Sequence, residues 1–204
     1  MSIFSAVLAY LVAPFICLFL YWRSLRQDYS SDRIFESGFF MIILVLLFVF
    51  LGNQYLASGL VKSQIIDPDG LWFWFGFLGL VASLFYTNMH KKFKFFEVLE
   101  AITPGLISWV SITLLAKGVW AGGIYFVLVM FYFVLSKNYK RIVWYKSGKI
   151  GFSALATLGV FFLIRSGLAI YDPSMLSLAG RMDGVLSAGL SFLSFFSIYN
   201  LAYN

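Results

Sequence analysis

The chain has 204 residues, of which 61% are hydrophobic, 21% aromatic and only 12% charged, and its mean hydropathy is +0.88. A soluble domain carries about 25% charged residues, and a chain of this length could not bury so much apolar surface in a core, so a water-soluble fold is excluded. The net charge of +6 would suggest nucleic acid as the partner of a soluble protein. Here the cations flank apolar stretches, which favours contact with anionic lipid headgroups, and we expect no nucleic-acid partner.

Seven apolar stretches divide the whole chain, 1–204, and each is close to the ~20 residues that a helix needs to cross the hydrocarbon core. Because lipid offers the backbone no hydrogen-bonding partner, stretches of this length must be helical. The sequence therefore predicts a single all-α transmembrane domain, a bundle of seven transmembrane helices. The predicted spans are 3–22, 38–58, 70–87, 97–116, 119–136, 150–170 and 183–202.

The Lys and Arg residues between these stretches crowd onto alternate sides of the predicted bundle. The first, third and fifth connectors hold Arg23, Arg26, Arg33, Lys91, Lys92, Lys94, Lys137, Lys140, Arg141, Lys146 and Lys149. The opposite side holds Lys62, Lys117 and Arg181. Because such cations are retained in the cytoplasm, we expect the N-terminus outside and the C-terminus in the cytoplasm.

Arg165 is a cation inside a predicted span, where a charge costs about 2.5–3.5 kcal/mol on insertion scales. It could extend to the outer headgroups, or it could bind the phosphate of an anionic lipid, for which the bidentate guanidinium is suited. Asp172, about two turns further along the same face, could pair with it instead. Arg181 and Asp183 flank the last span, and we expect them to form a solvated pair at its rim.

The remaining polar residues indicate no reaction. Glu97 and Glu100 open a predicted span, where the helix dipole favours acidic side chains. One histidine, His90, and one cysteine, Cys17, cannot form a recognisable metal site, and the sequence has no glycine-rich phosphate loop. We expect no metal and no cofactor. Two interpretations remain open, a lipid-handling protein that uses Arg165 and a structural or partner-binding membrane subunit.

The segment 70–106, GLWFWFGFLGLVASLFYTNMHKKFKFFEVLEAITPGL, resembles the centre of the bacterial prolipoprotein diacylglyceryl transferases. In that family a GLSFHGG-like segment opens a span, and a basic connector leads to an LLDxxAPGL-like helix start. The matching positions are Gly70, Leu71, Phe73, Gly76, Gly79, Glu100, Pro104, Gly105 and Leu106. Tyr125 falls at the family's QLYE segment and Arg165 near the arginine of its RFxxEFFR segment, so the resemblance extends over roughly residues 5–200.

The resemblance implies a multi-pass protein of a bacterial-type cytoplasmic (inner) membrane. The family moves a diacylglyceryl group from phosphatidylglycerol to a cysteine of lipoprotein precursors, so phosphatidylglycerol is the implied lipid. Together with the cost of burying charge, the resemblance makes Arg165, Asp172 and Tyr125 the candidate lipid-binding residues.

Most of the family's signature residues are replaced in this chain. The family's histidine position holds Trp74, ISWVSITLLAKGVWAGG stands in place of GRxGNFxNxE, and the acidic residue expected four positions after Arg165 is Ala169. The family's extracytoplasmic head domain is reduced to a few residues around Lys117. Losing one group that stabilises developing charge costs about 10²–10³ in rate. We therefore expect a reduced homologue that still binds phospholipid but has a degenerate catalytic site.

Two alternatives stay open. In the first, diacylglyceryl transfer to a lipoprotein precursor persists with displaced catalytic residues, which the sequence does not identify. In the second, the chain is a structural or partner-binding membrane subunit, which an exposed helix face of small residues would favour. Candidate faces hold Ser187, Gly189 and Ser191, or Gly122 and Gly123.

Overall fold

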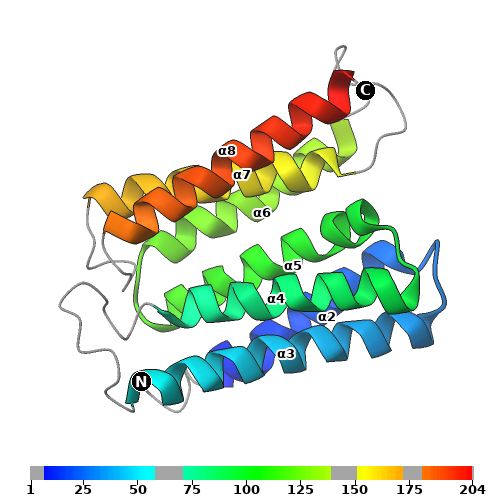
Figure 1. Ribbon diagram of the computed structural model, residues 1–204, viewed down its shortest axis with the longest axis horizontal. Helices are drawn as coiled ribbons and strands as arrows, with labels where there is room; N and C mark the ends of the chain where they lie inside the picture. The colour runs from blue at the N-terminus through cyan, green and yellow to red at the C-terminus, as the bar shows by residue number, and fades with distance from the viewer. Residues whose placement is uncertain (1–6, 58–70, 139–150, 172–180, 204) are drawn as a thin grey trace.

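The computed structural model describes residues 7–57, 71–138, 151–171 and 181–203, and every regular element in these ranges is a helix (Figure 1). A short π-helix, η1 (Leu8–Val12), leads directly into α2 (Ala13–Leu25). The longer helices that follow are α3 (Ser31–Ala57), α4 (Leu71–Lys91), α5 (Phe95–Ala116), α6 (Ala121–Asn138), α7 (Phe152–Tyr171) and α8 (Arg181–Tyr203).

The six helices α3 to α8 are long and apolar enough to cross a membrane, and the first apolar segment, Ala9–Leu25, is shorter. The predicted all-α architecture of a multi-pass membrane protein is confirmed, while its orientation stays a prediction. Several helices extend into the predicted connectors: α3 begins at Ser31 rather than at 38, and α4 continues to Lys91. Hydropathy locates only the apolar part of a helix, whereas backbone hydrogen bonding continues into the polar residues beside it.

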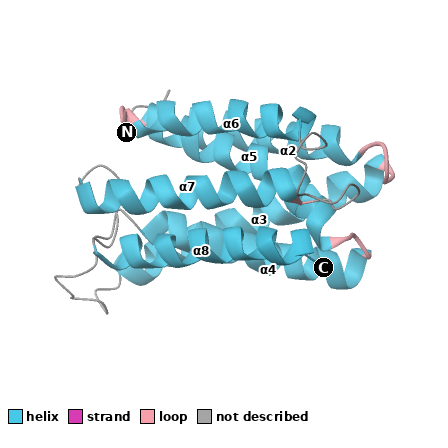
Figure 2. Ribbon diagram, turned by 90° about the horizontal axis from the view of Figure 1, so that it is seen from above, coloured by secondary structure: helices cyan, strands magenta, loops and turns pink. Residues whose placement is uncertain are grey.

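The helices run along one common direction (Figures 1 and 2), and Figure 1 shows them in two groups. In the first group α3 packs along α4, and α2 packs along α5. In the second group α7 packs along α8, with α6 beside α7. Helix α5 also contacts α6 and α7, so it joins the two groups.

Pro104 interrupts the backbone hydrogen bonding of α5. Donors from α6 and α7 bond to the carbonyl and the carboxylate of Glu100, one turn before the proline. A proline has no N–H to donate to the carbonyl one turn back, and Tyr132 of α6 donates its hydroxyl to that carbonyl, the one of Glu100, at 2.8 Å. The Glu100 carboxylate accepts a bond from the backbone N–H of Ala154 at 3.3 Å. Glu100 was expected to complement the dipole of its own helix, but its carboxylate instead complements the first turn of α7.

A tryptophan supports the start of the first apolar segment in the same way. Pro14 follows η1 within the first turn of α2 and has no N–H to give to that turn. The indole of Trp109 on α5 donates to the carbonyl of Ala9 at 3.1 Å. Because a membrane interior supplies no water to such a carbonyl, this bond ties η1 to α5.

Glu36 and Glu97, near the starts of α3 and α5, form ion pairs or hydrogen bonds with residues of other segments. Glu36 of α3 pairs with Lys91 of α4, with 2.5 Å between Oε1 and Nζ. Glu97, in the first turn of α5 as expected, accepts a hydrogen bond from Tyr29 at 2.5 Å and pairs with Lys94 at 3.0 Å. Burial and the bond to Glu97 raise the pKa of the Tyr29 phenol. These contacts link the connector before α3 to the start of α5.

Most of the small residues in the candidate faces lie buried between packed helices. Ser187 and Ser191 of α8 are 0% and 4% exposed, and Ser191 donates to the carbonyl of Gly159 on α7 at 2.8 Å. Ser111 of α5 donates to the carbonyl of Gly122 on α6 at 2.6 Å. The candidate partner-binding faces are therefore not exposed at Ser187, Ser191 and Gly122. Two other members of the predicted faces have open space beside them, Gly123 and Gly189.

Candidate functional site

Arg165 of α7 and Asp183 of α8 form an ion pair inside the bundle, with side chains that are 2% and 0% exposed. The guanidinium donates from Nη2 to Oδ1 of the carboxylate at 3.4 Å. The same oxygen accepts a bond from the indole of Trp74 on α4 at 2.6 Å. A buried charge is tolerated when it is paired and hydrogen-bonded. The pair therefore explains how two charged residues sit among apolar helices, and it connects α4 with α7 and α8.

Aromatic rings of α4 cover the guanidinium. Its central carbon lies 3.5 Å from the centroid of the Phe73 ring and 5.7 Å from that of Trp74. Stacking of a cation on a ring contributes about 2 kcal/mol where water is excluded. Phe73 packs in turn against Phe161 of α7, with 6.1 Å between ring centroids. The cation is thus held by one carboxylate and by the aromatic wall beside it.

The cluster around this ion pair keeps unused hydrogen-bonding capacity. Within the described ranges, no hydrogen-bond partner is found for Arg165 Nε, Asp183 Oδ2 and the Tyr125 hydroxyl. Tyr125 is nevertheless close enough to interact electrostatically with both charges. The hydroxyl of Ser187, one turn after Asp183, also has no partner there. Each such buried group costs about 1–3 kcal/mol, so the cluster is held by the surrounding packing rather than by saturated bonding.

The structure places the predicted lipid-binding residues as follows. Arg165 is enclosed by the bundle, which rules out the alternative that it extends to the outer headgroups. Tyr125 is fully buried beside it and packs on Phe161, with 4.8 Å between ring centroids. Asp172 lies outside the described residues. The structure therefore brings Arg165 and Tyr125 together, and their role in binding lipid stays a prediction.

The expected solvated pair of Arg181 and Asp183 is wrong, because the Asp183 carboxylate faces Arg165 instead of the rim. Sequence reasoning assigned Asp183 to the rim since it stands at the edge of the last predicted span. A usable signal was present: Arg165 lies near the end of one span and Asp183 near the start of the next. Antiparallel packing brings these two ends to the same depth.

A cavity of about 420 Å³ lies between the two groups of helices. Helix α4 lines it from Trp72 to Leu84 and α5 from Phe95 onward, in each case with residues spaced at three or four positions along one face. Residues of η1, α3, α7 and α8 complete the wall. The lining is mainly aliphatic and aromatic, and none of the described residues that form it is acidic. The cavity is therefore elongated and apolar along most of its length.

Polar side chains gather at the end of the cavity where α3 and α5 end and α4 begins, and we call this group the polar mouth. Its members are Asn53, Trp72, Thr113 and Lys117. The ammonium group of Lys117 lies 5.2 Å from the centroid of the Trp72 ring. Phe73, the next residue, lines the cavity and also stacks on Arg165, whereas Arg165 is not a lining residue. The ion pair therefore lies outside the cavity and contacts its wall through Phe73.

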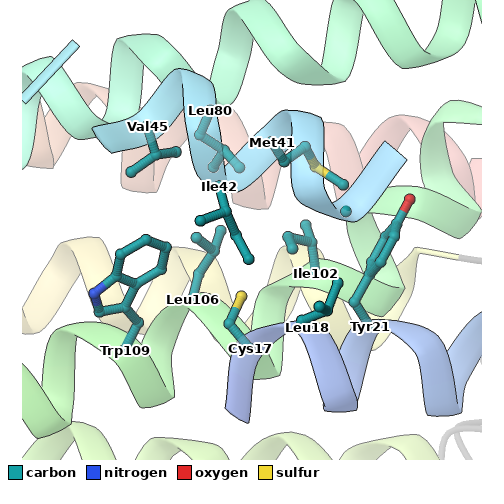
Figure 3. Close-up of a pocket in the computed structure, with 11 residues that line it drawn as sticks. Cys17, Leu18, Tyr21, Met41, Ile42, Val45, Leu80, Ile102, Leu106 and Trp109 are labelled. Atoms are coloured by element: carbon teal, nitrogen blue, oxygen red, sulfur yellow. The ribbon is translucent and has the colours of Figure 1, made fainter. Parts of the chain in front are cut away.

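A second space, of about 10 Å³, lies among α2, α3 and α5 (Figure 3). Cys17 points into it, together with Met41 and Ile102. A space of this size holds about one water molecule, and an apolar lining leaves such a space dry. Cys17 is 2% exposed and acts there as a small hydrophobic side chain.

Comparisons with protein families, with curated proteins and with solved structures found no match. Helix length and hydropathy establish a polytopic helical membrane protein. Its function has to be argued from the cavity and the residues around it.

Proposed function

We propose that this protein binds a phospholipid, with an acyl chain in the cavity between α4, α5 and α7. The cavity is the observation that carries the proposal. Its volume of about 420 Å³ falls within the roughly 300–1,000 Å³ of small-molecule sites. Its elongated apolar lining suits a hydrocarbon chain, and its polar mouth, which contains the cation Lys117, suits the headgroup at one end.

The sequence resemblance supports phosphatidylglycerol as the lipid and a bacterial-type inner membrane as the location. The replacement of the family's histidine by Trp74 supports binding without group transfer, because an indole N–H that donates to Asp183 offers no base. Arg165 and Tyr125 contact the lining residues Phe73 and Phe161 rather than the cavity itself. In the proposal they position the wall against which the chain lies.

Filling the cavity tests the proposal. Val110 of α5 lines the cavity, and Val110→Trp should exclude the chain. Val127→Trp is the matched control, because Val127 is 65% exposed on α6 and is not a lining residue. Native mass spectrometry of each purified protein counts the lipids retained after detergent exchange. Since overpacking costs about 1–3 kcal/mol, we expect retention to fall about tenfold in Val110→Trp and to stay at the wild-type level in the control.

A second substitution guards against a variant that does not fold. Val49→Phe narrows the same cavity from α3, and circular dichroism checks both proteins. Wild-type lipid retention in a folded Val110→Trp or Val49→Phe protein would contradict the proposal. Incubating the wild-type protein with phosphatidylglycerol and a lipobox peptide separates binding from catalysis, and we expect no thioether product.

A further inference from the structure

Two buried donors at the polar mouth lack a protein partner, as do several groups around the Arg165–Asp183 pair. Neither the Trp72 indole nitrogen nor the Thr113 hydroxyl has a hydrogen-bond partner within the described part of the chain. Both residues line the cavity, while the two donor atoms themselves expose almost no surface to it in this structure. The two donors come from different helices, α4 and α5, and meet at the same end of one cavity.

The other threonines of the described ranges and two indoles are satisfied, whereas several groups around Arg165 and Asp183 are not. Thr87, Thr103 and Thr157 each donate to the carbonyl four residues back, at 2.7 Å. The indoles of Trp74 and Trp109 donate to Asp183 and to a backbone carbonyl. Thr113 could bond its own helix in the same way but does not. An unpaired buried donor costs about 1–3 kcal/mol, so two of them beside a cavity and an unpaired cation favour a ligand that accepts hydrogen bonds.

The charge at this end favours an anion. Lys117 follows Thr113 by one helical turn, and no acidic side chain in the described residues pairs with it. Trp72 stands in the first turn of α4, whose dipole favours negative charge, but α3 and α5 end here with the opposite polarity, so Lys117 carries the electrostatic argument. The last carbonyls of α5 already accept bonds from the backbone N–H groups of residues 117–119. They therefore compete little for the Lys117 ammonium.

We propose that the polar mouth binds the phosphate of an anionic phospholipid whose acyl chain occupies the cavity. Lys117 supplies the charge, side-chain rotations of Trp72 and Thr113 bring their donors to the phosphate oxygens, and the Asn53 carboxamide bonds a headgroup hydroxyl. Hydrogen bonds to a charged group are about twice as strong as neutral ones, so these donors select the headgroup. The inference rests on the proposed function, because it assumes that the cavity holds a lipid.

A competition experiment tests the headgroup separately from the chain. The purified full chain is mixed with equal amounts of phosphatidylglycerol and phosphatidylcholine that carry the same acyl chains, and native mass spectrometry counts each bound lipid. The variants are Lys117→Gln and the near-isosteric Thr113→Val. The control is Lys137→Gln, which removes an exposed cation at the far end of α6.

We expect the wild-type protein and Lys137→Gln to prefer phosphatidylglycerol. Lys117→Gln should lose that preference about tenfold and Thr113→Val about threefold, while total lipid retention stays unchanged. Equal binding of the two lipids by the wild-type protein, or an undiminished preference in Lys117→Gln, would overturn the headgroup site and leave the proposed function standing. Retention of neither lipid would overturn the proposed function itself.

A further arm separates a lipid headgroup from free phosphate. The thermal unfolding of delipidated protein is followed with inorganic phosphate alone. A Lys117-dependent stabilisation by phosphate, together with no lipid preference, would assign the mouth to a free anion and contradict the proposal. A lipid preference that millimolar phosphate leaves intact supports it.

Discussion

The Arg165–Asp183 ion pair allows a quantitative prediction. Removing Asp183 leaves an unpaired guanidinium, whereas removing Arg165 leaves an unpaired carboxylate, and the two cost different amounts of stability. Asp183→Leu leaves a guanidinium that is 2% exposed without a carboxylate, and a guanidinium cannot lose its proton. It also removes the acceptor of the Trp74 indole. Breaking a buried pair costs about 3–5 kcal/mol, and the stranded indole adds about 1–3 kcal/mol. We expect Asp183→Leu to lower the free energy of unfolding by about 5 kcal/mol.

Arg165→Met should cost less. The remaining carboxylate keeps its bond from Trp74 and can become neutral by taking up a proton, so we expect about 3 kcal/mol. The double variant buries no charge, and replacing a buried pair by apolar side chains is often close to neutral. We therefore expect it to lose only the roughly 1–3 kcal/mol of the unpaired indole. The double variant should then be more stable than Asp183→Leu alone.

Reversible unfolding in mixed detergent micelles, followed by circular dichroism, measures all four proteins. A double variant whose loss equals the sum of the two single losses would refute the argument, because independent residues add and coupled residues do not. Single losses below about 0.5 kcal/mol would refute it as well, since a surface substitution has effects of that size.

Two other predictions concern the backbone and the orientation. Tyr132→Phe removes the donor to the Glu100 carbonyl and should cost about 0.6–1.7 kcal/mol in the same unfolding assay. Adding Pro104→Ala restores the helix N–H and should remove most of that effect, and a double variant no more stable than Tyr132→Phe would contradict the assigned role. In intact cells, a membrane-impermeant maleimide should label Trp120→Cys and not Gln27→Cys, whereas the reverse pattern would invert the predicted orientation.

The sequence predicted the helices well because apolar length is a local property. Each described span needs only its own residues to be recognised, and the helix ends were missed where polar residues such as Ser31 continue the backbone bonding. Arg165 was also found from the sequence, since a charge in an apolar span is costly wherever it faces.

Its partner and the cavity depend on how helices pack side by side, which the sequence does not state. Asp183 stands three residues into α8, and only the packing of α8 against α7 turns it towards Arg165. The cavity is lined by residues of several helices, among them α3, α4, α5, α7 and α8, so it exists only once these helices are packed together. Nothing in the sequence distinguishes Thr113 from other helical threonines. Only the structure shows that its hydroxyl lacks the usual carbonyl partner within the described residues.

Three consecutive residues of α4 fix the rotation of this helix about its own axis. Successive residues point about 100° apart, and Trp72, Phe73 and Trp74 contact Lys117, the Arg165 cation and the Asp183 carboxylate respectively. A one-residue insertion or deletion within α4 just after them would turn the triplet by that angle relative to the rest of the helix. The cavity mouth and the buried ion pair would be lost together, so neither can be re-engineered by sliding α4 without rebuilding the other.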